Sequence, residues 1–174
     1  SSPMALDLLL RVFDASRFLT DVLLRRPGFF EEIARGGELD EVKSAAILRE
    51  QIAPLMRYDD AGDRLRVFRR GEILRITIRD FLGLTDVVGI NRELSALAEA
   101  CLAASVDRVN ERSESPLSVI GLGKLGSGEL TFGSDLDIVF IGGTVEHARE
   151  DLSFMTRQTA EGIIFPIDTR LRPE

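Results

Sequence analysis

The chain has 174 residues, enough for one ordinary domain or for two small ones that share an interface. Hydrophobic residues make up 44% of it and charged residues 29%, a balance typical of globular proteins and far from that of disordered chains. With 22 basic and 29 acidic residues the formal net charge is −7. This charge argues against a nucleic-acid partner, because such binding depends on neutralising phosphates. It does not exclude a small nucleotide held by local cations and metal ions.

The sequence also predicts a cytoplasmic protein with no membrane partner. Its single cysteine, Cys101, cannot form an internal disulfide, as is typical of intracellular chains, and lies on an apolar helical stripe that places it in the core. No apolar run approaches the ~18 residues of a membrane span. The first residues lack the basic and then apolar pattern of a signal peptide.

The N-terminal part of the chain is predicted to be helical. Apolar residues recur there at intervals of three and four, and glycine and proline residues divide the pattern into segments. The predicted helices cover residues 4–26, 29–34, 39–56, 64–82 and 91–112. Asp40 and Glu41 are expected in the first turn of the 39–56 helix, where the helix dipole favours acids. Asn91 is expected to be the N-cap of the last helix.

The arginines of the predicted 64–82 helix are interpreted as surface residues. A solvated or salt-bridged face is the interpretation for Arg64, Arg66, Arg69 and Arg70. Arg75 and Arg79 lie one helical turn apart and are interpreted as helix-surface pairing residues, with contact to a partner as the alternative.

The sequence pattern changes after a polar connector at residues 111–116. Short branched runs predict strands at 117–122, 136–141 and 163–169, and a helix is predicted at 145–160. The predicted fold is therefore α+β, with an N-terminal helical bundle over residues 1–112 followed by a small α/β domain over residues 117–174.

Residues 121–137 form the most unusual stretch, because five glycines there surround Lys124. The stretch is not a Walker phosphate loop, since Lys124 is followed by Leu125 rather than by Ser or Thr, and its spacing does not fit a dinucleotide fingerprint. Gly126 and Ser127 still supply backbone N–H groups and a hydroxyl that can bind polyphosphate oxygens. Lys124 is interpreted either as a phosphate contact or as a solvated turn residue.

Three aspartates suggest a metal site. Asp135 and Asp137 are two residues apart, so on a strand they share one face at a spacing of about 6.6 Å. Mg²⁺ prefers carboxylate and phosphate oxygens and needs neither His nor Cys. Asp168, at the end of a later predicted strand, is expected to join them as a ligand and general base. The alternative is that the Asp-x-Asp pair is only part of a turn.

Two arginines follow the third aspartate. Arg170 and Arg172 are also two residues apart, so they are expected to face the same anionic substrate.

Two segments resemble the signatures of a known family. Gly-Lys-Leu-Gly-Ser-Gly-Glu-Leu-Thr-Phe-Gly-Ser-Asp-Leu-Asp-Ile-Val-Phe at 123–140 closely resembles a signature of the glutamine synthetase adenylyltransferase family, also called glutamate–ammonia-ligase adenylyltransferase. Ile-Asp-Thr-Arg-Leu-Arg-Pro at 167–173 is similar to its second signature. Helical segments at 23–27, 65–75 and 94–100 also have counterparts, so the resemblance covers nearly the whole chain.

The resemblance implies a nucleotidyltransferase fold of the DNA polymerase beta superfamily, placed after a helical region. It implies transfer of AMP from ATP to a tyrosine of glutamine synthetase, removal of that AMP by phosphorolysis with release of ADP, or both, in the regulation of nitrogen assimilation. Glutamine and the PII signal protein would be regulators. By motif matching, the catalytic metal ligands for Mg²⁺, or alternatively Mn²⁺, would be Asp135, Asp137 and Asp168. The nucleotide contacts would be Lys124, Gly126, Ser127, Ser134, Arg170 and Arg172.

The resemblance leaves several points open. Full-length family members carry two such domains, so the chain is expected to be a fragment whose nucleotidyltransferase domain is truncated after the second signature. Only 30 residues separate Asp137 from Asp168, so a deleted or omitted loop is one interpretation. Motifs of both the adenylylating and the deadenylylating domain occur, so the direction of the reaction stays open.

Two alternatives to an active enzyme also remain. One is a catalytically incomplete nucleotide-binding regulatory module of the same fold. The other is a mainly helical protein-interaction domain that contacts its partner through Arg70, Arg75 or Arg79.

Overall fold

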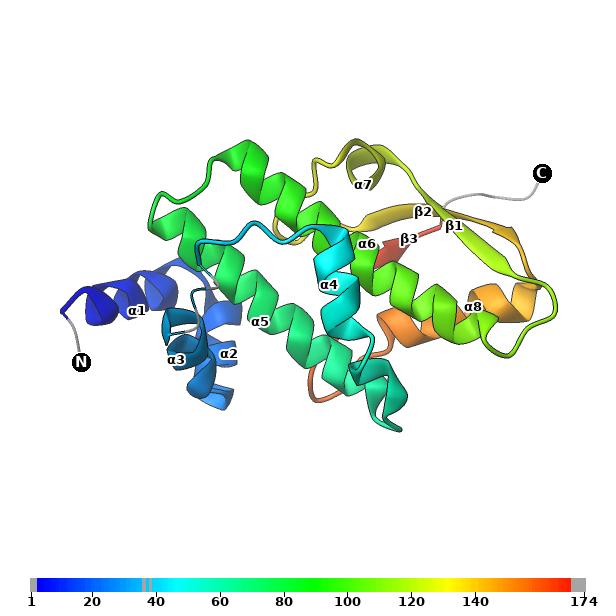
Figure 1. Ribbon diagram of the computed structural model, residues 1–174, viewed down its shortest axis with the longest axis horizontal. Helices are drawn as coiled ribbons and strands as arrows, with labels where there is room; N and C mark the ends of the chain where they lie inside the picture. Colours follow the sequence, from blue (N-terminus) through cyan, green and yellow to red (C-terminus); the bar gives the residue numbers. More distant parts are fainter. Residues whose placement is uncertain (1–2, 36, 38, 170–174) are drawn as a thin grey trace. The chain divides into compact units, whose positions relative to one another are not determined.

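The computed structural model describes residues 3–35, 37 and 39–169 (Figure 1). Residues 1–42 and 70–90 form one compact unit, and residues 43–69 and 91–174 form another. The described residues contain both helices and a small sheet, so the α+β class is confirmed. The last long helix ends at residue 110 and the first strand begins at residue 117. The boundaries of the two compact units lie at other positions in the chain. The domain boundaries proposed from the sequence, 1–112 and 117–174, therefore stay a prediction. No helix in the described ranges is long and apolar enough to cross a membrane.

The first unit contains α1 (Pro3–Ala15), α2 (Arg17–Arg25), α3 (Gly28–Arg35), residues 70–81 of α5 (Ala61–Phe81) and residues 87–90 of α6 (Val87–Asn110). The prediction of a single helix over 4–26 was wrong, because the chain breaks at Ser16. Ser16 has extended backbone angles, with φ −152° and ψ 113°, and its hydroxyl accepts a hydrogen bond from the Leu19 amide. A serine in this conformation caps a new helix. A second helix, α2, therefore starts after Ser16, although the apolar periodicity of the sequence continues through this position.

The predicted helix over 39–56 starts later than expected. In the structure α4 (Ala45–Ile52) begins after Ser44, whose extended backbone and side chain cap it, and a 3₁₀ helix (Leu55–Arg57) follows. The preceding segment has other partners for its backbone. The Glu41 carbonyl accepts a 3.1 Å hydrogen bond from Arg75, and the Leu39 carbonyl accepts one from Arg79. The placement of Asp40 and Glu41 in a first helical turn was therefore wrong.

Arg75 and Arg79 are buried inside the first unit rather than on a helix surface. Their exposed fractions are 1% and 2%. Arg75 Nε also donates to Glu72 Oε2 at 2.8 Å, in a pair whose two side chains are almost fully buried. The surface interpretation of these two arginines was wrong, because they bind backbone carbonyls and an internal carboxylate of their own unit.

Helices α5 and α6 are present close to the predicted positions. Helix α6 begins four residues before the expected N-cap Asn91, because the Asp86 side chain accepts a 2.7 Å hydrogen bond from the Gly89 amide and caps the first turn. Cys101 is fully buried, which confirms its predicted place in the core.

The second unit contains a sheet of strand order β1-β2-β3, formed by Leu117–Gly121, Leu136–Gly142 and Ile167–Asp168. Strands β1 and β2 are antiparallel, and β2 and β3 are parallel. The first two strands are confirmed to within one residue. The third is much shorter than the predicted 163–169, because the Ile164 and Phe165 amides donate to the Met155 carbonyl at the end of the preceding helix.

Two further helices of the second unit flank β2 in the sequence. The short helix α7 (Gly123–Ser127) follows β1 and was not predicted. Helix α8 (Val145–Thr156) starts as expected, with Thr144 and His147 forming a reciprocal capping box. It ends four residues before the predicted 160, because Thr159 and Gly162 pair with each other in a turn.

Helices α6 and α8 lie together along one side of the sheet (Figure 1). They are joined by a 2.5 Å hydrogen bond from the Ser105 hydroxyl of α6 to Asp151 Oδ1 of α8. Asp151 is fully buried, and its Oδ2 has no hydrogen-bond partner. Burial raises the pKa of Asp151 to about 6, although the Ser105 hydrogen bond and the positive charge of Arg108 oppose the shift.

We expect Asp151→Asn to stabilise the protein near pH 7.5 but not near pH 4, with a difference of up to ~3 kcal/mol between the two conditions. The folded carboxyl keeps its proton to a higher pH than the unfolded one. The free energy of unfolding therefore falls as the pH rises from about 4 to about 6, and the amide removes this dependence. Urea unfolding at both pH values measures the effect. The exposed Asp59→Asn is the control. An equal gain at both pH values for Asp151→Asn would contradict the expectation.

Candidate active site

The three predicted acids lie at the same end of the paired strands β2 and β3. Asp135 immediately precedes β2, Asp137 is the second residue of that strand, and the parallel register places Asp137 opposite Asp168. Paired residues on neighbouring strands lie about 4.8 Å apart and project to the same face of a sheet. The sheet therefore brings residues 31 positions apart in the sequence side by side.

The face that carries Asp137 is the open face of β2. Leu136 and Ile138 are buried, with exposed fractions of 0% and 2%, whereas Asp137 between them is exposed. This alternation is expected for a strand that covers the core with one face only. The carboxylate of Asp137 is therefore accessible to a ligand from solvent.

Gly123 lies directly against the Asp137 carboxylate. It has φ +51°, and a Cβ at this position would lie 2.7 Å from Asp137 Oδ2. The Leu122 amide also donates to the Asp137 carbonyl at 2.8 Å, which fixes the turn beside the strand. Only glycine allows so close an approach in this conformation. The sequence predictions did not include Gly123, and the signal for it was its place in the glycine-rich run just before Lys124.

The predicted phosphate-binding residues lie on α7, after this turn. A Cβ on Gly126 would lie 2.7 Å from the Gly121 carbonyl oxygen, so this glycine allows α7 to pack against the end of β1. Lys124, Gly126 and Ser127 are exposed. The Ser127 hydroxyl donates to Glu129 Oε2 at 2.8 Å. The three residues thus lie on the accessible short helix α7, which begins at Gly123, the glycine in contact with Asp137.

Ser134 stabilises the turn that leads into Asp135. Its hydroxyl accepts a hydrogen bond from the Thr131 amide at 3.1 Å and lies 2.8 Å from the Thr131 hydroxyl. The start of this turn is anchored to α6, because the buried Leu130 donates its amide to the Ser95 hydroxyl. The position of Asp135 therefore depends on local hydrogen bonds as well as on the strand.

Arg170 and Arg172, the two predicted substrate-binding arginines, lie outside the described residues. The predicted lysine, serines, glycine and aspartates all lie inside them.

The described acids do not form a complete metal site by themselves. Among the residues that the structure describes, no three His, Cys, Asp or Glu side chains are close enough together to hold a metal ion. Mg²⁺ in nucleotide sites is bound by one or two carboxylates and completes its shell with water and substrate phosphates. Asp135 and Asp137, both exposed and two residues apart, fit this requirement, with Asp168 as the neighbour of Asp137.

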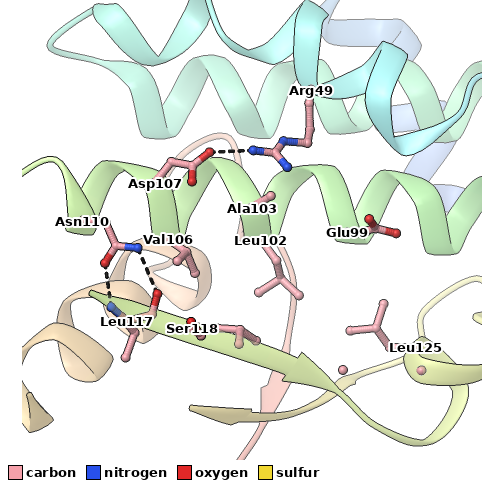
Figure 2. Close-up of a pocket in the computed structure, with 13 residues that line it drawn as sticks. Arg49, Glu99, Leu102, Ala103, Val106, Asp107, Asn110, Leu117, Ser118 and Leu125 are labelled. Atoms are coloured by element: carbon pink, nitrogen blue, oxygen red, sulfur yellow. Dashed lines mark hydrogen bonds and ion pairs between the residues drawn. The ribbon is translucent and has the colours of Figure 1, made fainter. Parts of the chain in front are cut away.

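A pocket of about 570 Å³ lies between α6, β1 and α7. Figure 2 shows Asp107 paired with Arg49, at 2.9 Å, beside it. Figure 2 also shows the Asn110 side chain bound to both backbone groups of Leu117, at 2.7 and 2.9 Å, which ties the end of α6 to the start of β1. Gly126 contributes to the lining, whereas the three acids do not.

Comparison with known proteins identifies the family. A family model described as glutamate-ammonia ligase adenylyltransferase matches residues 6–174, nearly the whole chain. The chain belongs to this family. It is 33% identical to the bifunctional glutamine synthetase adenylyltransferase/adenylyl-removing enzyme of Pseudomonas aeruginosa over 94% of its length, and 31% identical to that of Chromobacterium violaceum over 98%. The match to the protein of this name from Mycobacterium bovis is 34% over 76% of the chain.

The chain corresponds to only part of these adenylyltransferase-family relatives. It covers 20% of the Pseudomonas protein and 21% of the Chromobacterium protein. The comparison therefore establishes the family resemblance predicted from the two signatures, whereas the reaction and the roles of individual residues are proposals.

We expect Gly123→Ala to weaken binding of Mn²⁺ by at least about 10-fold, because the new methyl group would displace the Asp137 carboxylate. Gly128→Ala is the matched control: Gly128 has φ +73°, but a Cβ there meets nothing within 4 Å. In both variants the left-handed backbone costs the alanine roughly 1–2 kcal/mol. Only Gly123→Ala also places a methyl group against the Asp137 carboxylate. Mn²⁺ titration followed by electron paramagnetic resonance measures the affinity. Equal losses in the two variants would show that the contact with Asp137 is irrelevant to metal binding.

Proposed function

We propose that this chain carries a metal-dependent nucleotidyltransferase site that transfers AMP from ATP to a tyrosine of glutamine synthetase, removes it by phosphorolysis, or does both. The observation that carries the proposal is the parallel register that pairs Asp137 with Asp168, with Asp135 two residues before Asp137. Membership of the adenylyltransferase family supports the choice of substrate, since the relatives are named for both reactions.

The sheet and its acids are also consistent with the nucleotidyltransferase fold of the DNA polymerase beta superfamily, which we propose for the second unit. An Asp-x-Asp pair at the start of β2 and a third aspartate on the adjacent strand β3 support that assignment. The helical residues before β1 then support the sheet through α6, whose Asn110 binds Leu117 and whose Ser95 binds Leu130.

In the proposed reaction, Asp135 and Asp137 bind Mg²⁺ or Mn²⁺ together with the phosphates. The cation, when bound, supplies positive charge that stabilises the charge developing on those phosphates. Lys124 and Ser127 of α7 orient the triphosphate through their ammonium and hydroxyl groups. The Gly126 amide already donates to the Leu122 carbonyl at 3.0 Å, so Gly126 acts here by allowing α7 to pack against the end of β1. Arg170 and Arg172 remain predicted contacts to the same anion.

Asp168, opposite Asp137, adds a third carboxylate beside the cation and is also the general base. It accepts the proton of the tyrosine hydroxyl while the tyrosine oxygen forms a bond to the α-phosphorus of ATP. The bond between the α-phosphorus and the bridging oxygen breaks, and pyrophosphate leaves. In the opposite process an oxygen of inorganic phosphate, HPO₄²⁻, forms a bond to the phosphorus of the tyrosine-bound AMP, and the bond from that phosphorus to the tyrosine oxygen breaks. The proton given up by the phosphate moves to the tyrosine oxygen, and ADP is released. Both reactions place a phosphorus atom beside the same carboxylates.

The two alternative functions differ in what they require. A helical interaction domain that uses Arg75 or Arg79 is disfavoured, because both side chains are buried in their own unit. A nucleotide-binding module without chemistry would bind ATP with Mg²⁺ tightly and yet show no turnover, so ATP titration combined with an AMP-transfer assay separates it from the enzyme. Regulation by glutamine and by the PII signal protein stays a prediction from the family resemblance.

We expect Asp135→Asn and Asp137→Asn each to lower AMP transfer and phosphate-dependent AMP removal by at least about 100-fold, because each removes a charged metal ligand. Radiolabelled AMP on glutamine synthetase measures both directions, with the full chain as the enzyme. Glu146→Gln, which neutralises an exposed acid in the first turn of α8, is the control and should leave both rates unchanged. Wild-type rates in the two aspartate variants would refute the proposed function.

A further inference from the structure

The position of Asp168 requires more support than its own strand supplies. Within the described residues, strand β3 pairs with β2 over two residues. So short a ladder offsets little of the conformational entropy lost when a chain segment is fixed, which is roughly 1–2 kcal/mol for each backbone residue. The chain that leads into β3 must therefore be held by other contacts.

Arg66 of α5 binds this chain at three backbone carbonyls. Its Nε donates to the Gly162 carbonyl at 2.8 Å. Its Nη2 donates to the carbonyls of Phe154 and Arg157, at 3.0 and 2.8 Å. The last carbonyls of a helix lack partners within the helix, so Arg66 satisfies the end of α8 and the following loop at the same time.

The surroundings of Arg66 are built to hold its guanidinium in place. The side chain is almost fully buried, and burial lowers its pKa, although Asp63, 3.5 Å away, opposes this shift. A Cβ on Gly62 would lie 2.8 Å from Arg66 Nη1, so the glycine leaves room for the guanidinium. Asp63 also accepts a 2.8 Å hydrogen bond from the Thr159 hydroxyl, which ties the same loop to the same helix. A guanidinium with several fixed acceptors is a rigid clamp.

Further contacts connect the loop after α8 to the start of β3. Two residues after Gly162, the Ile164 amide donates to the Met155 carbonyl at 2.9 Å, and the Phe165 ring lies 4.3 Å below the guanidinium of Arg69. The Pro166 carbonyl then accepts a 2.9 Å hydrogen bond from the Leu136 amide, which starts the parallel pairing. Every residue in this path belongs to the second unit.

We propose that Arg66 is a positioning residue that sets Asp168 beside Asp137 by holding the chain between α8 and β3. It does not touch the reacting groups itself. The inference rests on the proposed function, because the readout is the carboxylate site that the reaction uses. It assigns a role to an arginine that the sequence suggested to be part of a solvated or salt-bridged face.

The test is a double-mutant cycle in the full chain, with Mn²⁺ affinity measured by electron paramagnetic resonance. We expect Arg66→Met and Asp168→Asn each to weaken Mn²⁺ binding by about 10-fold, and the double variant to be no weaker than Asp168→Asn alone. Arg66→Lys keeps the charge but not the fork of donors, and is expected to weaken binding less than Arg66→Met. It also carries the test if the methionine variant does not fold.

Hydrogen exchange supplies a readout that does not depend on the metal. In Arg66→Lys and Arg66→Met we expect faster exchange at Ile164, Phe165 and the β3 amides, with unchanged exchange in the pairing of β1 with β2. Arg64→Met is the matched control, because Arg64 lies on the same helix but forms a partly exposed pair with Asp60 and contacts Tyr58. It should leave both exchange and Mn²⁺ affinity unchanged.

The outcomes separate this inference from the proposed function. If Asp137→Asn abolishes Mn²⁺ binding but the effects of Arg66→Met and Asp168→Asn multiply in the double variant, the positioning role is refuted and the proposed function stands. Wild-type Mn²⁺ affinity in both Arg66 variants would refute the role in the same way. If Asp137→Asn leaves Mn²⁺ binding and AMP transfer unchanged, the proposed function fails and the inference fails with it.

Discussion

The parallel pairing of β2 with β3 is the constraint on which the candidate site depends. It places Asp137 opposite Asp168 although 30 residues lie between them. Because the pairing extends over two residues in the part of the chain that the structure describes, the surrounding structure must define it. Helix α8 ends where Arg66 binds its last carbonyls, the loop turns at Thr159 and Gly162, and the Pro166 carbonyl joins β2. The open face of the sheet can therefore carry exposed carboxylates while the opposite face covers the core.

Buried arginines have a similar role in each compact unit. Arg75 and Arg79 bind the carbonyls of Glu41 and Leu39 in the first unit, and Arg66 binds carbonyls of the loop in the second. In all three cases the guanidinium donates to backbone carbonyls at a helix end or in a segment outside the helices and strands, and buried backbone of this kind needs such donors. This use of arginine explains why chain segments without regular structure are fixed in both units.

Several features of the fold could be predicted because they depend on local chemistry. Apolar periodicity located α5 and α6, and branched runs located β1 and β2. The break at Ser16 and the extended segment before Ser44 were missed, because a cap competes with periodicity over a single residue and the donors from Arg75 and Arg79 come from a distant part of the chain. The predicted length of β3 was wrong for the same reason, since Met155 binds the amides of Ile164 and Phe165.

The sequence by itself determined the acid motif, the glycine-rich turn, the α+β class and the family resemblance, because residue type and short spacing carry that information. Only the tertiary structure decided which face of β2 is open, that Asp168 stands opposite Asp137, that Gly123 is in contact with that carboxylate, and that Arg66 is buried. The sequence pattern of Arg66 is the same as that of an exposed helical arginine. Arg66 is buried because the end of α8 and the following loop pack over it. The hydrogen bonds that hold them there join residues about 90 positions apart in the sequence, so a local pattern cannot reveal them.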